Sequence, residues 1–215
     1  GDHRVMEATV RLCREHGVAV GAQPGYPDLA GFGRRPMSFD AAEIESMVRY
    51  QLGALEAFCR SEGTEMQHVK PHGALYNSAA GDPELARAIA RAVASFSQDL
   101  ALFGLASSVP MAEAATEAGI RFVPEAFADR RYLPDGFLQP RSIAGSVISD
   151  PSEAADQARS IAIDGRVVTS DGSQFAIRAE SICCHGDTPG AVAIAAAVRD
   201  ALESAGIGCS APRGP

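Results

Sequence analysis

Short apolar segments alternate with amphipathic segments along the whole chain. Apolar, β-type runs occur at residues 18–22, 66–69, 100–105, 120–124 and 182–184. Segments with apolar residues at helical spacing occur at residues 2–16, 40–62, 83–96, 110–118, 150–163 and 189–205. Buried parallel strands are usually joined by helices, so this alternation predicts an α/β fold with a mainly parallel sheet.

Two segments do not follow this alternation. Residues 23–33 are rich in glycine and proline and predict a long loop, and residues 125–142 predict an irregular polar stretch. A hairpin is expected where residues 167–169 and 174–177 flank Asp171-Gly172. No composition shift marks a linker, so we expect one domain over residues 1–215.

Charge and cysteine content narrow the class of protein. The 215 residues include 19 Lys+Arg and 27 Asp+Glu, giving a net charge of −8, which argues against binding to nucleic acid or to an anionic membrane. No apolar run reaches the roughly 18 residues of a membrane-spanning helix. The five cysteines match neither a zinc site nor a secreted disulfide framework, so a cytoplasmic location is expected.

Polar residues gather just after the predicted strands. The strand at 66–69 continues into Lys70-Pro71-His72, and alternation along an extended chain would place His68, Lys70 and His72 on one face. Sites in parallel α/β folds form at the carboxyl ends of strands, so the loops after four strands are expected to converge in a barrel-like arrangement. His72 is the strongest candidate for a base or metal ligand, whereas His68 and Lys70 have plausible structural roles as well.

A second group of candidates follows the strand at 120–124. Glu125, Asp129, Arg130 and Arg141 combine acids with guanidinium groups that can hold a carboxylate or phosphate, although a solvated charged loop is the alternative. His185-Gly186-Asp187 follows the last strand and precedes a helix, where free amides can bind an anion.

The segment Gly31-Phe32-Gly33-Arg34-Arg35 contains two glycines but no P-loop or dinucleotide-binding pattern. Phe32 is therefore expected to pack within its loop. From the residues alone, the chain is expected to be an α/β enzyme with a polar site for an anionic small molecule, and the reaction type does not follow.

Four segments together resemble the LamB/YcsF family. They are Gly21-Ala22-Gln23-Pro24-Gly25-Tyr26-Pro27-Asp28 with Gly31-Phe32-Gly33-Arg34, His68-Val69-Lys70-Pro71-His72-Gly73-Ala74-Leu75-Tyr76, Glu125-Ala126-Phe127-Ala128-Asp129-Arg130, and Cys184-His185-Gly186-Asp187. The resemblance implies a (β/α) barrel-like fold related to the glycoside hydrolase/deacetylase superfamily. It also implies ATP-driven opening of 5-oxo-L-proline to L-glutamate, carried out with partner subunits B and C.

The resemblance suggests roles for the candidate residues. His72 would be a general base or a metal ligand, alone or with His68, and a divalent ion such as Mg²⁺ would accompany ATP. Asp129 would orient or activate water, and Lys70 and Glu125 would assist catalysis. The residues expected to bind phosphate or the substrate carboxylate are Arg34, Arg130, Arg141, His185 and Asp187.

The chain departs from the family pattern in two places. Gln23 stands where many members have histidine, which puts a ligand role there in doubt. The family also has two upstream motifs, Asn-Ala-Asp-Xaa-Gly-Glu and Gly-Phe-His-Ala-Gly-Asp. Of these, the sequence contains only Gly1-Asp2, which match the last two residues of the second motif. We therefore expect the barrel to lack its N-terminal strands. Two alternatives remain open: a stand-alone metal-dependent deacetylase or amidohydrolase, and a non-catalytic scaffold subunit.

Overall fold

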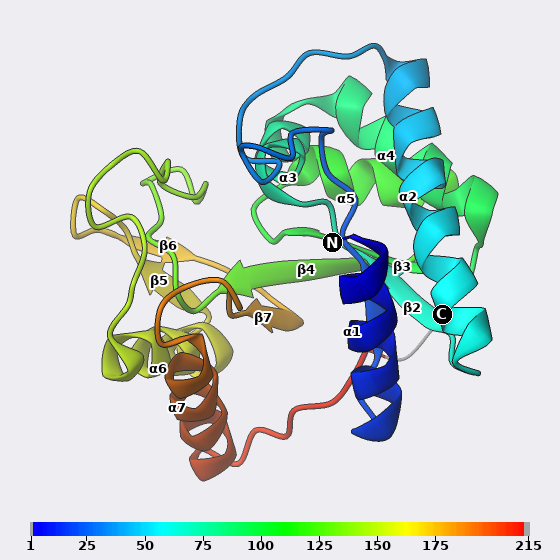
Figure 1. Cartoon of the computed structure of the whole chain (residues 1–215). Coiled ribbons are helices and arrows are strands. Elements are labelled where there is room, and N and C mark those ends of the chain that lie inside the picture. Colours follow the sequence, from blue (N-terminus) through cyan, green and yellow to red (C-terminus); the bar gives the residue numbers. More distant parts are fainter. Residues whose placement is uncertain (1, 213–215) are drawn as a thin grey trace. The chain divides into compact units, whose positions relative to one another are not determined.

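The computed structural model describes residues 2–212, so Gly1, part of the match to the upstream motif, lies outside the described residues. The chain divides into two compact units. The first comprises the residues up to Gly104, Ser108–Phe122 and the residues from Ala211 on, and the second comprises Leu105–Ser107 and Val123–Ser210. Helices and parallel strands alternate in the chain, which confirms the predicted α/β class (Figure 1). The expectation of one domain stays a prediction.

Parallel strands connected by helices make up the first unit. Strands β1, β2 and β3 are neighbours in that order, and Ala22 pairs with Val69, which pairs with Leu102. The elements, in chain order, are α1 (His3–Glu15), β1 (Val20–Ala22), α2 (Ala41–Ser61), β2 (Met66–Val69), α3 (Gly73–Gly81), α4 (Pro83–Phe96), β3 (Ala101–Leu105) and α5 (Val109–Ala118).

Side-chain caps fix where the helices of this unit begin. Asp40 forms a capping box with Glu43 at the start of α2, where each side chain accepts from the backbone N–H of the other. Asp82 accepts from two backbone N–H groups at the start of α4, and Pro83 occupies the first helical position. Figure 1 shows α2 and α4 side by side, and their fully buried Leu52 and Ile89 belong to one apolar core.

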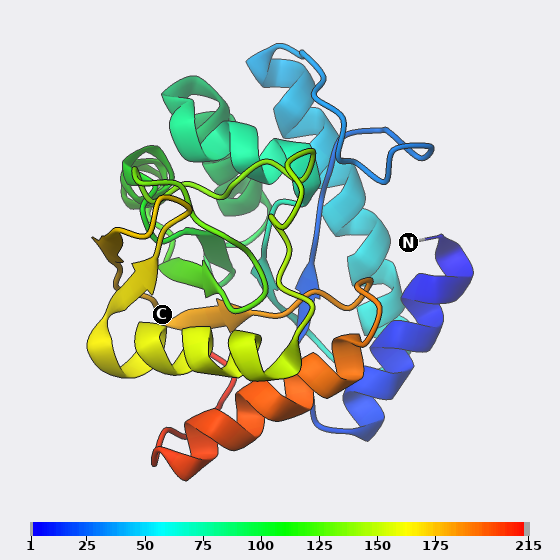
Figure 2. The same ribbon diagram turned by 90° about the vertical axis from the view of Figure 1, so that its left-hand side faces the viewer.

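The second unit contains a parallel strand pair and an antiparallel hairpin. Strands β4 and β7 pair in parallel, with Glu125 opposite Ser181, and β5 and β6 form the hairpin predicted around Asp171-Gly172. The elements are β4 (Phe122–Phe127, from Val123 on in this unit), α6 (Pro151–Arg159), the π-helix η1 (Ser160–Asp164), β5 (Arg166–Val168), β6 (Gln174–Ala176), β7 (Ser181–Cys183) and α7 (Ala191–Ser204). Helices α6 and α7 lie against each other (Figure 2) and bury Ala154, Ala158 and Ile194.

Two elements differ from the sequence prediction. The sequence pattern does not predict helix α3, because Gly73 and Gly81 at its ends, with Asn77 and Ser78 between them, are residues typical of turns. Strand β4 extends to Phe127, so Glu125 lies within a strand and not in the irregular stretch. Strand β4 is longer than predicted because Glu125 is buried and its apolar neighbours Ala126 and Phe127 continue the strand.

Among residues 2–212, no helix combines the length and the apolar character needed to cross a membrane.

Helix α7 offers a matched test of packing in the second unit. Ile194 is fully buried against α6, whereas Val192 on the same helix is 85% exposed. Ile194→Ala is expected to lower the free energy of unfolding by about 2–5 kcal/mol, because it leaves a cavity. Val192→Ala is expected to change it by less than about 0.5 kcal/mol. Denaturant unfolding of both variants checks this, and equal effects would contradict the described packing of α7.

Candidate functional site

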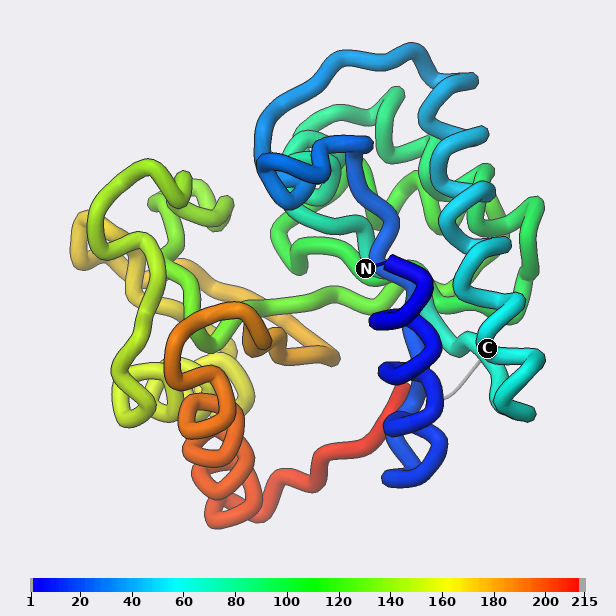
Figure 3. The backbone as a smooth tube through the Cα atoms, in the orientation of Figure 1, coloured from blue at the N-terminus to red at the C-terminus, as the bar shows by residue number. Residues whose placement is uncertain are grey.

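In the first unit, the chain between β1 and α2 forms a long loop that folds back on itself (Figure 3). The carboxylate of Asp28 organises this loop. This side chain is 1% exposed and accepts hydrogen bonds from the backbone N–H groups of Gly31, at 2.9 Å, and Arg35, at 3.2 Å. The guanidinium of Arg35 donates to it through Nε at 2.8 Å and forms an ion pair with it. These bonds from Arg35 lower the pKa of Asp28 to about 2, although burial opposes the shift.

His72 lies at the N-terminus of α3 and is held on two sides. Its backbone N–H donates to the carbonyl of Pro24 at 2.8 Å, and its ring Nε2 lies 2.8 Å from the carbonyl oxygen of Phe32. A carbonyl oxygen only accepts, so Nε2 must carry the proton of this bond. The ring of Phe32 meets the imidazole edge-on, with centroids 5.1 Å apart. The expectation that Phe32 packs within its loop is incomplete, because the residue is 58% exposed and its backbone carbonyl holds His72.

His68 lies on β2 with its ring against the backbone of β1. A Cβ on Gly21 would lie 2.0 Å from His68 Nε2, so only glycine leaves room for the ring. The ring also packs on Phe103 with centroids 4.5 Å apart, and its Nδ1 is buried without a hydrogen-bond partner among the described residues. Burial of the ring, with a further contribution from the charge of Lys70, lowers the pKa of His68 to about 4.

Lys70 and Arg34 supply positive charge to the same unit. Lys70 follows the end of β2, and its backbone N–H donates to Ala22 at 2.9 Å, so the extended pairing continues beyond the strand towards His72. Its ammonium lies 6.0 Å from the ring centroid of Tyr76. The guanidinium of Arg34 lies 5.2 Å from the ring centroid of Phe32. Lys70 is also the only lysine in the sequence.

In the second unit, Asp129 and His185 form a hydrogen-bonded pair. The side chain of Asp129 is fully buried at the end of β4, and that of His185 follows β7 and is 20% exposed. The backbone N–H of His185 donates to Asp129 Oδ2 at 2.8 Å, and the ring Nδ1 lies 2.9 Å from Oδ1. Burial alone would raise the pKa of Asp129, but the hydrogen bonds and charge of His185 outweigh it and lower the pKa.

This pairing fixes which ring nitrogen of His185 is protonated. A carboxylate only accepts, so Nδ1 donates, and in the neutral ring the lone pair is on Nε2. The ring of Phe127 stacks on the imidazole with centroids 5.7 Å apart, which limits its rotation. A buried acid that orients a partly exposed histidine is an arrangement suited to proton transfer.

Arg130 and Gln157 brace the segment that carries Asp129. Arg130 is 4% exposed, and its guanidinium donates to the carbonyls of Ser146, at 3.3 Å, and Gln139, at 2.5 Å. The side-chain amide of Gln157 on α6 donates to Phe127 and Arg130 carbonyls at 2.7 and 2.8 Å. The sequence does not predict this role of Gln157, because a glutamine on an amphipathic helix carries no signal of the backbone it will contact.

The other candidates of this unit occupy different environments. Glu125 is 2% exposed within β4, Arg141 is partly buried in the segment after Gln139, and Asp187 is exposed between β7 and α7. The structure thus joins Asp129 to His185 in one unit and places Arg34, His68, Lys70 and His72 in the other. Catalytic and binding roles for these residues stay predictions.

Metal binding by His68 and His72 gains no support from the donor atoms. Within residues 2–212, no three His, Cys, Asp or Glu side chains are grouped so as to hold a metal ion. One nitrogen of His72 is engaged with Phe32, and the ring of His68 is pressed against β1. The side chains present do not fit a metal centre, and we derive no catalytic step through one.

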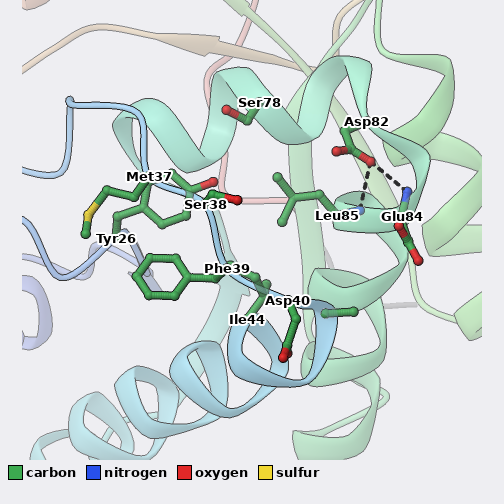
Figure 4. A pocket seen from close by; sticks show the side chains of 11 residues that line it. Tyr26, Met37, Ser38, Phe39, Asp40, Ile44, Ser78, Asp82, Glu84 and Leu85 are labelled. Carbon is green, nitrogen blue, oxygen red and sulfur yellow. Dashed lines mark hydrogen bonds between the residues drawn. The ribbon is translucent and has the colours of Figure 1, made fainter.

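A cavity of about 320 Å³ lies elsewhere in the first unit, between the segment before α2 and helices α3 and α4 (Figure 4). Its lining includes the acids Asp40, Asp82 and Glu84, which disfavour an anionic ligand. Two of them cap helices: Asp40 begins α2 and Asp82 begins α4. Burial raises the pKa of Tyr26 in this cavity, and the charge of Asp82 adds to the shift. None of the predicted site residues lines this cavity, and the helix caps give Asp40 and Asp82 a structural role.

Comparison with known proteins assigns the family. The family model described as "LamB/YcsF family" matches residues 1–214. The chain belongs to the LamB/YcsF family. The A subunit of 5-oxoprolinase from Chloroflexus aggregans is 54% identical over 213 residues, which cover 99% of this chain and 84% of that protein. The protein of the same name from Symbiobacterium thermophilum is 50% identical, over 99% of this chain and 81% of its own length.

A solved structure of a related protein has the same fold. The lactam utilization protein of Thermus thermophilus superimposes with a TM-score of 0.88 at 50% sequence identity. The match covers 96% of this chain and 82% of that protein. The resemblance inferred from the four motif segments is therefore confirmed for the family and for the α/β fold.

The buried ring of His68 predicts a specific acid sensitivity. Between pH 6.5 and about 4 the unfolded chain binds a proton at His68 that the folded chain does not, so the free energy of unfolding falls as the pH falls. The difference of 6.5 − 4 = 2.5 units corresponds to about 3 kcal/mol. This contribution is fully present above pH 6.5 and is lost by about pH 4.

Denaturant unfolding of the unsubstituted chain and of His68→Gln at a series of pH values measures this contribution. The variant is expected to lose less stability than the unsubstituted chain across that window, because glutamine does not titrate. Comparing the two pH dependences, instead of the stabilities at one pH, removes the packing effect of the substitution. Parallel pH dependences would show that His68 is not buried as described.

Proposed function

We propose that this chain is the A subunit of a 5-oxoprolinase, an enzyme that opens 5-oxo-L-proline to L-glutamate with hydrolysis of ATP. The supporting observation is that relatives about 50% identical over nearly the whole chain are named as the A subunit of 5-oxoprolinase. The related structure from Thermus thermophilus is described as a lactam utilization protein, and 5-oxoproline is a lactam. The chain would thus be a hydrolase that acts on a cyclic amide.

The chemistry of a lactam explains the use of ATP. An amide carbon is a poor electrophile, and transfer of the γ-phosphoryl group to the lactam oxygen, with release of ADP, makes it reactive. Water then adds to this carbon and loses a proton, and the ring nitrogen leaves as it takes up a proton. Hydrolysis of the remaining acyl phosphate gives L-glutamate and phosphate. The sequence of steps needs a base for water, an acid for nitrogen and cations for the phosphate.

His72 and Lys70 are the residues of the first unit that suit these tasks. We assign His72 as the general base, because its ring is held by the Phe32 carbonyl while one nitrogen keeps a lone pair. Lys70 and Arg34 would hold phosphate or the substrate carboxylate. Of the 19 Lys and Arg residues, only residue 70 is a lysine, and this favours a specific role for its ammonium group.

Asp129 and His185 are the corresponding residues of the second unit. The hydrogen bonds between them favour Asp129 as the residue that orients His185, in place of direct activation of water. His185 would then exchange protons through Nε2. Arg130 would contribute chiefly by bracing this segment, since its guanidinium already donates to two backbone carbonyls. Arg141 would help to bind anionic groups, and Glu125 and Asp187 would help to hold water.

The relatives are named as one lettered subunit, which implies that they act with other subunits. We propose that the partners are subunits B and C of 5-oxoprolinase, that ATP is bound as its Mg²⁺ complex, and that the assembly works in the cytoplasm. The free energy of ATP hydrolysis would be coupled to lactam opening only in this complex.

The first test is replacement of His72 in the complex reconstituted with subunits B and C. His72→Ala is expected to abolish ATP-coupled formation of glutamate, because it removes the group assigned to take the proton from water. His16→Ala, at an exposed histidine, is the matched control and is expected to keep full activity. Coupled measurement of phosphate and glutamate gives the result, and near-normal turnover by His72→Ala would overturn the assignment.

Assays of the chain alone and of the reconstituted complex separate the alternative functions. Release of acetate or ammonia from an amide substrate by the chain alone, without ATP, would indicate a stand-alone deacetylase or amidohydrolase instead. Full activity of every site variant within the complex would indicate a scaffold subunit. The proposed function requires that glutamate formation depend on ATP, on the partner subunits and on His72 together.

A second test addresses the pair in the second unit. Asp129→Asn keeps the size of the side chain but replaces a carboxylate that accepts from His185 Nδ1 with a neutral amide. The turnover rate is expected to fall by about 10²-fold or more, because the orientation and protonation of His185 are lost. Asp156→Asn, at an exposed acid on α6, is the matched control. Equal rates for the two variants would remove Asp129 from the mechanism.

A further inference from the structure

Phe32 adopts a backbone conformation that its side chain does not favour. Its φ is +56°, and it is the only non-glycine residue with a positive φ in the part of the chain that the structure describes. Bulky residues are rare in this left-handed region, and strain of this kind is found where the surrounding structure imposes it. The hydrogen bonds of Asp28 to Gly31 and Arg35 on either side of Phe32 provide that constraint.

The unusual conformation has a definite result, which is to place two successive carbonyl groups on the start of α3. The carbonyl of Phe32 accepts from His72 Nε2 at 2.8 Å, and the carbonyl of Gly33 accepts from the backbone N–H of Ala74 at 2.8 Å. Gly33 also has a positive φ, of +69°, and a Cβ there would lie 3.1 Å from His72 Cδ2. The loop thus fits closely against both the ring of His72 and the helix that carries it.

We infer that Phe32 is a positioning residue for His72: its backbone carbonyl keeps Nε2 protonated, so that Nδ1 is the nitrogen that accepts a proton. The catalytic use of Nδ1 rests on the proposed function, whereas the tautomer of His72 does not. When Nδ1 takes a proton, the Phe32 carbonyl continues to accept from Nε2 and stabilises the imidazolium that forms. The ring of Phe32, edge-on to the imidazole at 5.1 Å, restricts its rotation in addition.

Substitutions at position 32 separate the backbone effect from the effect of the ring. Phe32→Val and Phe32→Asn both remove the ring and are similar in volume. Asparagine tolerates the left-handed conformation, whereas a β-branched valine does not. Valine is therefore expected to move the carbonyl away from His72, and asparagine to keep it in place. Phe32→Gly, which adopts a positive φ without strain, is expected to behave like the asparagine variant.

The decisive measurement is the tautomer of His72, observed by nitrogen NMR on the chain labelled with ¹⁵N in its five histidines. A His72→Gln spectrum assigns the signals. The unsubstituted chain, Phe32→Asn and Phe32→Gly are expected to show neutral His72 protonated on Nε2, and Phe32→Val a mixture of tautomers. A His72 protonated on Nδ1 in the unsubstituted chain, or equal spectra for the valine and asparagine variants, would overturn the inference.

Kinetics in the reconstituted complex give the functional readout. Phe32→Val is expected to lower kcat by about 10-fold, with KM unchanged. This loss is smaller than the roughly 10²–10⁴-fold rate enhancement typical of a general base, because the base is displaced and not removed. Phe32→Asn is expected to stay within about 3-fold of the unsubstituted complex, since it keeps the base in position. A larger loss for asparagine than for valine would contradict the inference. The tautomer of His72 is measured without substrate, so it does not depend on the proposed function. If the proposed function were wrong, the NMR result would be unchanged and only the activity of the complex would be missing.

Discussion

The buried carboxylate of Asp28 sets the geometry around His72. Backbone N–H groups and the guanidinium of Arg35 converge on it, and together they close the loop that carries Phe32 and Gly33. The loop in turn supplies one carbonyl to the imidazole and one to the first turn of α3. A buried charge is stable only when it is fully paired, so the loop has little freedom to take another shape without exposing or unpairing this acid. The carboxylate of Asp28 therefore holds the β1–α2 loop in the shape that contacts the start of α3.

His72 and His185, the two histidines proposed to move protons, are oriented through different ring nitrogens and by different kinds of acceptor. His72 donates through Nε2 to a neutral carbonyl, whereas His185 donates through Nδ1 to an ionised carboxylate. A carboxylate interacts with an imidazolium more strongly than a carbonyl does, because it carries a full charge. The two rings are thus suited to different tasks, and lactam opening requires proton movement in both directions.

Much of the fold can be predicted from the sequence, because strands and helices leave periodic apolar patterns. The hairpin predicted at Asp171-Gly172 is confirmed. Helix α3 is not predicted because its residues are typical of turns, and the start of the helix is held by contacts with the β1–α2 loop. The site can be predicted only as a set of residue types. The Asp129–His185 pair joins positions 56 residues apart, and nothing in either local pattern specifies the partner. The role of Phe32 depends on a backbone atom that every residue possesses, so the sequence carries no sign of it.

The position of Lys70 has a consequence for covalent chemistry. Every other basic side chain except histidine is a guanidinium, which acylating reagents and acetyl donors do not modify under ordinary conditions. Only one side chain in 215 residues therefore carries an amine of the kind that these reagents modify, and it follows β2, two residues before His72. Acetylation of this one nitrogen would remove the charge that follows β2 and leave every other charge of the molecule unchanged.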